Sequence, residues 1–204
     1  MLEVRRSLDR GYADHGWLKS YHTFSFADYY DPVYEEFGPL RVINEDRIKP
    51  GKGYDNDAHR DIEILTYVLA GELEHKDSLG NAAVIRPGDV QRLSAGAGVT
   101  QSELNPSASQ QVHLLQIRIT PSTAGLAPGY ERKHFAASEK RGKLRLVASL
   151  TGEDGSVRLQ QDARVYTGFF NAAERTEFEV AKGRRAYAHV ASGSIAVNET
   201  RLNA

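Results

Sequence analysis

The sequence predicts an all-β protein, and three observations support that prediction. Short runs of apolar and β-branched residues recur along the chain, separated by Gly, Pro, Asn and Asp. Turn signals follow one another at intervals of roughly 8–12 residues, which is typical of β-sandwiches and barrels. No ten-residue stretch shows the 3.6-residue apolar period of an amphipathic helix. The strands expected from this pattern span residues 62–69, 71–76, 82–86, 112–119, 144–150, 165–170 and 186–197.

One predicted strand and one predicted hairpin are the most informative about the fold. The run Val112–Ile119 is rich in β-branched and apolar residues, which favours a largely buried strand. Residues 72–76 and 82–86 flank a polar, Gly-containing turn at residues 77–81, a pattern that predicts a β-hairpin. The following Pro87-Gly88-Asp89 predicts the next turn.

Composition restricts the class of protein. A chain of 204 residues can bury a sizeable core in one large or two small β domains. Its 26 basic and 27 acidic residues nearly cancel, so neither a nucleic acid nor a membrane is expected as a partner. The chain has no cysteine, which excludes disulfides and thiolate metal sites. It shows no signal-peptide pattern and no apolar run of about 20 residues, and we expect a soluble, cytoplasmic protein.

The composition along the chain suggests two domains. Residues 121–142 are polar and contain Gly and Pro, as expected at a domain boundary. We therefore predict an N-terminal domain at residues 1–125 and a C-terminal domain at residues 140–204. Residues 196–204 read as a strand entering a turn with nothing after it, so we expect the C-terminal domain to be incomplete.

Two pairs of polar side chains are the candidate site. Asp57 and His59 form one pair, and Gln101 and Glu103 form the other. Each pair has i, i+2 spacing, which places both side chains on one face of a β-strand. The four groups could therefore converge inside a barrel and bind a metal. Without an ion the two carboxylates would repel each other, and Arg60 and Arg92 are candidate cationic partners.

Several motifs resemble the pirin family of bicupins, and within it the bacterial pirin-like quercetin 2,3-dioxygenases. The resemblance covers essentially the whole chain. It is carried by the segments HGWL at residues 15–18, HTFSFA at 22–27, LRVIN at 40–44, DIEILTYVL at 61–69 and EHKDSLGN at 74–81. It implies two tandem cupin (jelly-roll) barrels, with the C-terminal one truncated.

The resemblance also implies a metal site. Members of the family hold one Mn, Fe, Ni or Cu-type ion with three histidines and a glutamate in the N-terminal barrel. The matching positions here are Asp57, His59, Gln101 and Glu103, so two ligands are retained and two are replaced. A set with one imidazole, two carboxylates and an amide is harder than three imidazoles and a carboxylate, and favours Mg, Mn or Ca-like ions.

Other polar and aromatic residues have structural as well as functional interpretations. Glu63 is expected to support a strand, although it could assist a weakened metal site. His75 is expected to bond the Asp77 turn, and His22 to be a buried histidine with its hydrogen bonds satisfied. The aromatic residues between 29 and 37 could form a loop over the barrel mouth, or lie as partly buried rings in a surface turn.

Three functions remain open from the sequence. The resemblance implies a metal-dependent dioxygenase acting on a flavonol-like small molecule, with Glu103 as a ligand and as the base for the 3-hydroxyl. The replaced ligands favour an alternative, a catalytically degenerate pirin that binds a protein partner in a regulatory role. A third alternative is metal-independent acid–base chemistry, such as isomerisation, by Asp57, His59 and Glu103.

Overall fold

The computed structural model describes residues 2–204 and confirms the all-β prediction. A seven-stranded sheet with the order β1-β2-β3-β10-β5-β8-β11 forms one wall of the larger part of the molecule. Neighbouring strands in it are antiparallel throughout. The strands are β1 (Gly11–Asp14), β2 (Leu18–His22), β3 (Leu40–Ile48), β5 (Glu63–Ala70), β8 (Asp89–Ser94), β10 (Val112–Ile119) and β11 (Gly129–His134).

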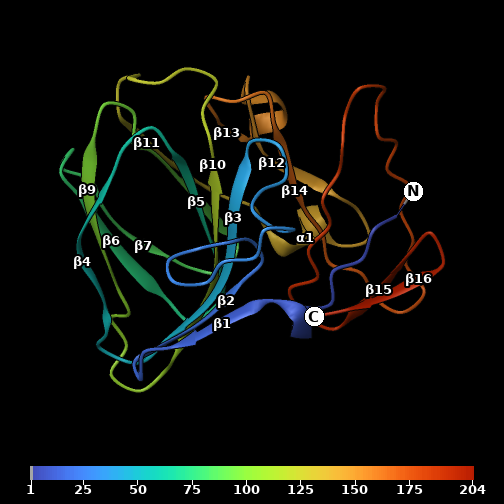
Figure 1. Ribbon diagram of the computed structural model, residues 1–204, viewed down its shortest axis with the longest axis horizontal. Helices are drawn as coiled ribbons and strands as arrows, with labels where there is room; N and C mark the ends of the chain where they lie inside the picture. The colour runs from blue at the N-terminus through green and yellow to red at the C-terminus, as the bar shows by residue number, and fades with distance from the viewer. Residues whose placement is uncertain (1) are drawn as a thin grey trace.

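A four-stranded antiparallel sheet with the order β4-β9-β6-β7 forms the opposite wall. Its strands are β4 (Gly53–His59), β6 (Leu73–Asp77), β7 (Ala82–Ile85) and β9 (Val99–Leu104). Figure 1 shows the two sheets enclosing a barrel, with β4 and β9 on the side away from the C-terminal part. The predicted hairpin of β6 and β7 and the buried strand β10 are confirmed.

The C-terminal part is smaller and less regular. A three-stranded sheet contains β12 (Arg145–Ser149), β13 (Val157–Arg158) and β14 (Arg164–Thr167), and a separate hairpin joins β15 (Ser194–Val197) to β16 (Thr200–Asn203). The strand predicted at residues 186–197 is wrong except for β15, because residues 186–193 make no strand pairing. The remaining elements are α1 (Ala137–Lys140) and the 3-10 turns η1 (Ser7–Asp9) and η2 (Glu153–Gly155). No helix among residues 2–204 is long and apolar enough to cross a membrane.

The predicted boundary segment at residues 121–142 contains a strand of the first barrel. Its strand β11 pairs with β8 in antiparallel register from Gly129–Ser94 to His134–Asp89. The chain therefore returns to the edge of the large sheet before it enters the C-terminal part (Figure 1). The division into domains at residues 1–125 and 140–204 remains a proposal.

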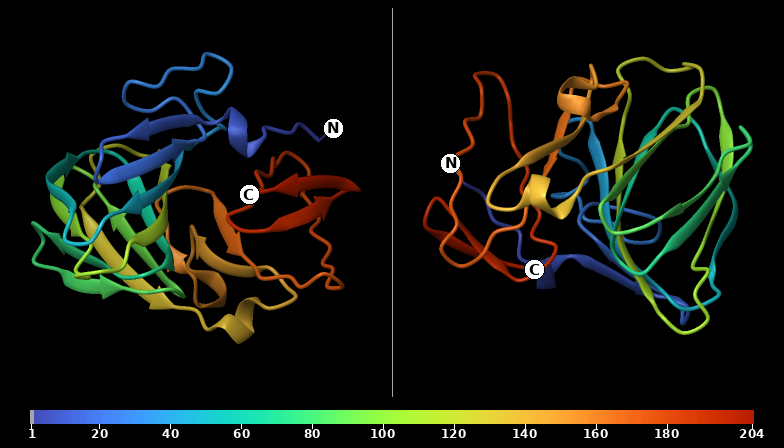
Figure 2. Two further views of the ribbon diagram at one scale, coloured as in Figure 1. Left: turned by 90° about the horizontal axis from the view of Figure 1, so that it is seen from below. Right: turned by 180° about the vertical axis from the view of Figure 1, so that it is seen from behind.

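Side chains of β5 alternate between its two faces and so pack into separate parts of the hydrophobic core. Val68 belongs to a cluster inside the barrel with Leu73 and Ile85. Leu65, on the other face of the strand, belongs to a cluster with Val147 of the C-terminal sheet. The large sheet is therefore covered on both faces, and the C-terminal part packs against its outer side (Figure 2).

A buried carboxylate links the N-terminal segment to the large sheet. Glu45 of β3 accepts a hydrogen bond from Arg10 at 2.9 Å, and one of its oxygens lies 2.8 Å from Nε2 of His113. Arg47 lies 2.9 Å from the same oxygen. Burial raises the pKa of Glu45, but the hydrogen bonds of His113 and Arg10 and the charge of Arg47 outweigh burial and bring it down to about 2. Ionised Glu45 therefore stabilises the folded state.

The substitution Glu45→Gln is expected to lower the free energy of unfolding by about 3 kcal/mol at pH 7. The stabilisation by Glu45 is fully present above its ordinary pKa of 4.5 and is lost as the pH falls toward about 2. Urea unfolding of both proteins between pH 7 and pH 3 measures the difference, which should shrink below pH 4.5. An equal difference at every pH would contradict this account.

Candidate metal centre

Strands β4 and β9 bring the four predicted side chains to the same wall of the barrel. In the antiparallel register Asp57 lies opposite Gln101, and Tyr54 lies opposite Glu103. Paired residues point to the same face of a sheet, and Gln101 and Glu103 are both buried. The convergence expected from the i, i+2 spacing is therefore present on both strands.

A β-bulge in β4 sets the direction of Asp57 and His59. Between Tyr54 and Asp57 the register shifts, so three steps along β4 correspond to two along β9. Because side-chain direction alternates, one extra residue turns Asp57 and His59 to the face that Tyr54 occupies. Asn56 within the bulge has φ of 53°, a left-handed conformation that asparagine tolerates better than most residues.

His59 is the centre of the polar cluster. Its Nε2 lies 2.8 Å from Oδ2 of Asp57 and 3.2 Å from Nε2 of Gln101. Ligand atoms at about 2.1 Å from one octahedral ion lie about 3 Å from each other, so the separation of Asp57 and His59 suits a shared cation. Gln101 would join them through Oε1 once its amide is turned, because the oxygen then takes the place of the nitrogen. The His59 side chain is only 6% exposed, whereas that of Asp57 is 36% exposed and faces the open side of the site.

With the Gln101 amide oriented as seen here, the contacts at Nε2 of His59 conflict. A hydrogen bond from His59 to Asp57 needs a proton on Nε2, whereas a hydrogen bond from the Gln101 amide needs a lone pair there. One nitrogen cannot make both. Among residues 2–204, the buried Oε1 of Gln101 also has no hydrogen-bond partner. A divalent cation accepts lone pairs from an imidazole nitrogen, a carboxylate oxygen and an amide oxygen, so the donor set fits such an ion.

Glu103 lies deeper in the barrel and is held at both oxygens. Thr66 donates to Oε1 at 3.2 Å, and the amide of Gln116 donates to Oε2 at 3.3 Å. Burial raises the pKa of Glu103 to about 7, although the hydrogen bond from Thr66 and the charge of Arg118 act in the opposite direction. A carboxylate with this pKa can take up or release a proton near neutral pH.

The cation closest to the carboxylates is Arg118 of β10, which the sequence analysis did not identify. Nε and Nη2 of Arg118 donate to Oε1 of Gln116 at 2.9 and 2.7 Å, and Nη2 lies 3.9 Å from Oδ2 of Asp57. The prediction that Arg60 or Arg92 fills this role is wrong. Arg60 lies beside Asp61, and Arg92 contacts Ser94 and Glu131.

The charges and hydrogen bonds around Asp57 favour its ionised form. Burial raises the pKa of Asp57, but the hydrogen bond from His59 and the charges of His59 and Arg118 outweigh burial and lower it overall. Arg118 also fixes the Gln116 amide, because its two hydrogen bonds occupy the amide oxygen and leave the NH2 group to donate to Glu103. The guanidinium therefore orients Glu103 through Gln116.

Three other residues have the structural roles expected for them. Glu63 lies on the same side of β5 as Leu65, outside the barrel, where it accepts hydrogen bonds from Ser94 and from the backbone of Gln160. It therefore cannot assist the metal site. Nε2 of His75 lies 3.1 Å from Asp77, and Nδ1 of His22 lies 2.9 Å from Asn44.

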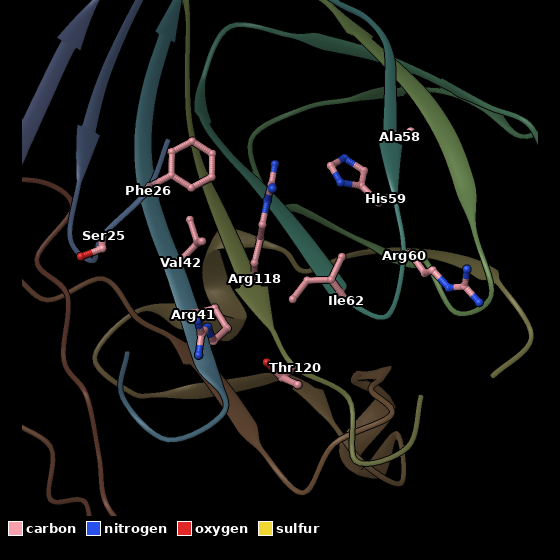
Figure 3. A pocket seen from close by; sticks show the side chains of 10 residues that line it. All are labelled: Ser25, Phe26, Arg41, Val42, Ala58, His59, Arg60, Ile62, Arg118 and Thr120. Carbon is pink, nitrogen blue, oxygen red and sulfur yellow. The ribbon is translucent and has the colours of Figure 1, made fainter. Parts of the chain in front are cut away.

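A cavity of about 410 Å³ opens beside the cluster. Figure 3 shows Arg118 projecting between the ring of Phe26 and the imidazole of His59. Phe26 lies in the segment before the aromatic residues between 29 and 37, for which both a loop over the barrel mouth and a surface turn were considered. The residues that line the cavity are Ser25, Phe26, Arg41, Val42, Ala58, His59, Arg60, Ile62, Arg118 and Thr120.

In the side-chain positions seen here, no three His, Cys, Asp or Glu residues among residues 2–204 are grouped closely enough to hold a metal. The carboxylate of Glu103 is instead hydrogen-bonded to Thr66 and Gln116. Of the residues described, only Asp57 and His59 remain as His or carboxylate donors, so a metal ion at this position also needs the Gln101 amide as a donor. The harder donors of this set favour an ion that prefers oxygen.

The fold and the cluster define a cupin-type barrel with a candidate metal centre on one wall. The family profile described as Pirin matches residues 2–119, and the profile described as Quercetinase C-terminal cupin domain matches residues 146–204. The chain belongs to the pirin family.

Three relatives illustrate this membership. The chain is 44% identical over its whole length to a protein named quercetin 2,3-dioxygenase from Escherichia coli (strain K12), and covers 87% of that protein. It is 41% identical to a pirin-like protein of Caulobacter vibrioides over 98% of this chain and 87% of the relative. The crystal structure of bacterial pirin YhhW from Escherichia coli in complex with nickel(II) superimposes with a TM-score of 0.92 at 42% identity, over 98% of this chain and 85% of that one. A close structural relative of this chain thus binds a divalent metal.

The substitution Asn56→Val is expected to destabilise the fold by about 1–2 kcal/mol, because a β-branched residue is strained at positive φ. It should also weaken metal binding, since the bulge directs Asp57 and His59 inward. Thermal unfolding and a metal titration measure the two effects. Asn56→Gly is the matched control, because glycine adopts this conformation readily. Loss of metal binding in Asn56→Gly as well would show that the asparagine side chain acts in another way.

Proposed function

We propose that this protein is a divalent-metal-dependent dioxygenase that acts on a flavonol-like substrate. The observation that carries the proposal is the convergence of Asp57 Oδ2, His59 Nε2 and the Gln101 amide, beside the buried Glu103 and an open cavity. Relatives named quercetin 2,3-dioxygenase that match the chain over its whole length support the reaction class. Neither the contacts nor the relatives support the alternative of a regulatory protein-binding role.

Each side chain has a role that follows from its position. Asp57, His59 and Gln101 would hold the ion, and a bound ion would supply Lewis-acid stabilisation of an ionised substrate hydroxyl. Glu103 would accept the proton of that hydroxyl, because its pKa of about 7 allows proton uptake near neutral pH. Thr66 and Gln116 hold the carboxylate in place, and Phe26 offers an aromatic surface at the cavity.

The donor set reduces the advantage of nickel and copper over manganese, relative to a site with three imidazoles. A single imidazole with carboxylate and amide oxygens is a hard set, whereas nickel and copper gain most from additional imidazoles. The loss of two imidazoles relative to the family pattern therefore changes the expected metal without requiring a change in the fold. Mn²⁺ is accordingly the first ion to supply in an assay.

Oxygen uptake with quercetin in the presence of Mn²⁺ tests the proposed activity. Uptake should require both the metal and quercetin, and Glu103→Gln should lower the rate at least about 100-fold if Glu103 is the base. The matched control is Glu74→Gln on the neighbouring strand β6, where Glu74 pairs with Lys76 outside the site. Absence of uptake with every divalent metal tried would overturn the proposed function.

The double variant Asp57→His with Gln101→His is expected to shift the metal preference toward Ni²⁺. It supplies three imidazoles beside the Glu103 carboxylate, which should strengthen Ni²⁺ binding at least about tenfold relative to Mn²⁺. Competition titrations of the wild-type and double-variant proteins measure the ratio. An unchanged ratio would mean that positions 57 and 101 do not contact the ion.

A further inference from the structure

The cavity beside the cluster is lined by cationic side chains. Three of its ten lining residues are arginines from different segments: Arg41 in β3, Arg60 after β4 and Arg118 in β10. No aspartate or glutamate is among the residues that line it. A positive lining favours a ligand with a negative charge.

The acidic partners of these arginines are not part of the lining. Arg41 pairs with Glu36, and Arg60 lies 3.6 Å from Asp61. The Oδ2 of Asp57 is engaged by His59, and Glu103 lies in the interior of the barrel. These carboxylates are engaged by other groups and are absent from the lining, whereas Arg118 projects between Phe26 and His59 (Figure 3).

Arg118 is the most firmly held of the three. Its side chain is 19% exposed, whereas that of Arg60 is 72% exposed. Two hydrogen bonds to Gln116 fix one edge of the guanidinium, and its central carbon lies 5.2 Å from the centroid of the Phe26 ring. Among residues 2–204, Nη1 makes no hydrogen bond, so this nitrogen can donate to a ligand. A fixed guanidinium loses little side-chain entropy when it binds an oxyanion.

The apolar part of the lining indicates the rest of the ligand. Phe26 presents a ring beside Arg118, and Val42 and Ile62 complete an apolar surface. Such a wall suits a flat aromatic ring.

From these observations we infer that the cavity binds planar aromatic oxyanions, such as a carboxylate or an ionised phenol or enol, and that Arg118 recognises the negative charge. The inference deepens the proposed function, on which it rests for the identity of the substrate site. It makes Arg118 a determinant of substrate specificity.

A matched pair of ligands tests the inference without reference to catalysis. Calorimetric titration of the full chain with 3-hydroxy-2-naphthoate and with neutral 3-hydroxy-2-naphthamide compares the same ring system with and without the charge. The naphthoate should bind at least about tenfold more tightly, as expected for a charge-assisted hydrogen bond. Arg118→Gln should abolish that preference, whereas Arg60→Gln should reduce it no more than about twofold, because Arg60 is largely exposed.

Two further measurements keep the test decisive. The naphthoate preference should persist in the presence of a chelator, and it should weaken as salt is raised while naphthamide binding stays constant. Equal affinities for the two ligands, a preference retained by Arg118→Gln, or a preference abolished by the chelator would each overturn the inference. If quercetin-dependent oxygen uptake is absent but the Arg118-dependent preference is present, the proposed reaction fails and the anion site stands. If uptake is present and the preference is absent, the proposed reaction stands and the inference of an anion site fails.

Discussion

The pairing of β4 with β9 is the constraint on which the candidate site depends. It places Asp57 opposite Gln101, and the extra residue in β4 turns Asp57 and His59 inward. Without that bulge, strict alternation would put both side chains on the outer face of the sheet. Within the bulge, Asn56 adopts a left-handed backbone conformation. The conformational strain at this residue is offset by the strand pairing on either side. A single inserted residue therefore determines whether Asp57 and His59 join Gln101 and Glu103 inside the barrel.

Charge balance is the second constraint on the barrel interior. Asp46, Asp57 and Glu103 carry carboxylates, and Arg118 is the cation that lowers the pKa of all three. Burial nevertheless raises the pKa of Asp46 to about 6 and that of Glu103 to about 7. One guanidinium does not neutralise three carboxylates, so an additional positive charge would stabilise their ionised forms. A divalent cation at His59 meets this need and would also take up Oε1 of Gln101, which has no hydrogen-bond partner within residues 2–204.

The sequence predicted those features that depend on local pattern. The i, i+2 spacing was sufficient to place Gln101 and Glu103 on one face of β9, and the pattern of residues 71–86 was sufficient for the hairpin of β6 and β7. The role of Arg118 was not predictable, because it depends on β10 lying across the barrel from β4. Arg60 and Arg92 were closer in sequence to the acidic residues but belong to other contacts. The strand predicted at residues 186–197 failed for a related reason, since a β-prone segment without a pairing partner does not form a strand.

The chain can belong to the pirin family and still lack two of the family's histidine ligands. In that case the barrel is kept and the preferred metal ion differs. The scaffold superimposes on a nickel-bound relative. The resemblance to the family implies histidines at the positions where this chain carries Asp57 and Gln101. The central claim is that Asp57, His59 and Gln101 hold one divalent cation, with Glu103 beside it as the base. Its most direct test is metal analysis by mass spectrometry of the untagged protein after incubation with Mn, Fe, Ni and Cu and removal of free metal. With each metal supplied separately, we expect close to one manganese ion per chain and little in His59→Ala, whereas no retained metal in the wild-type protein would contradict the claim.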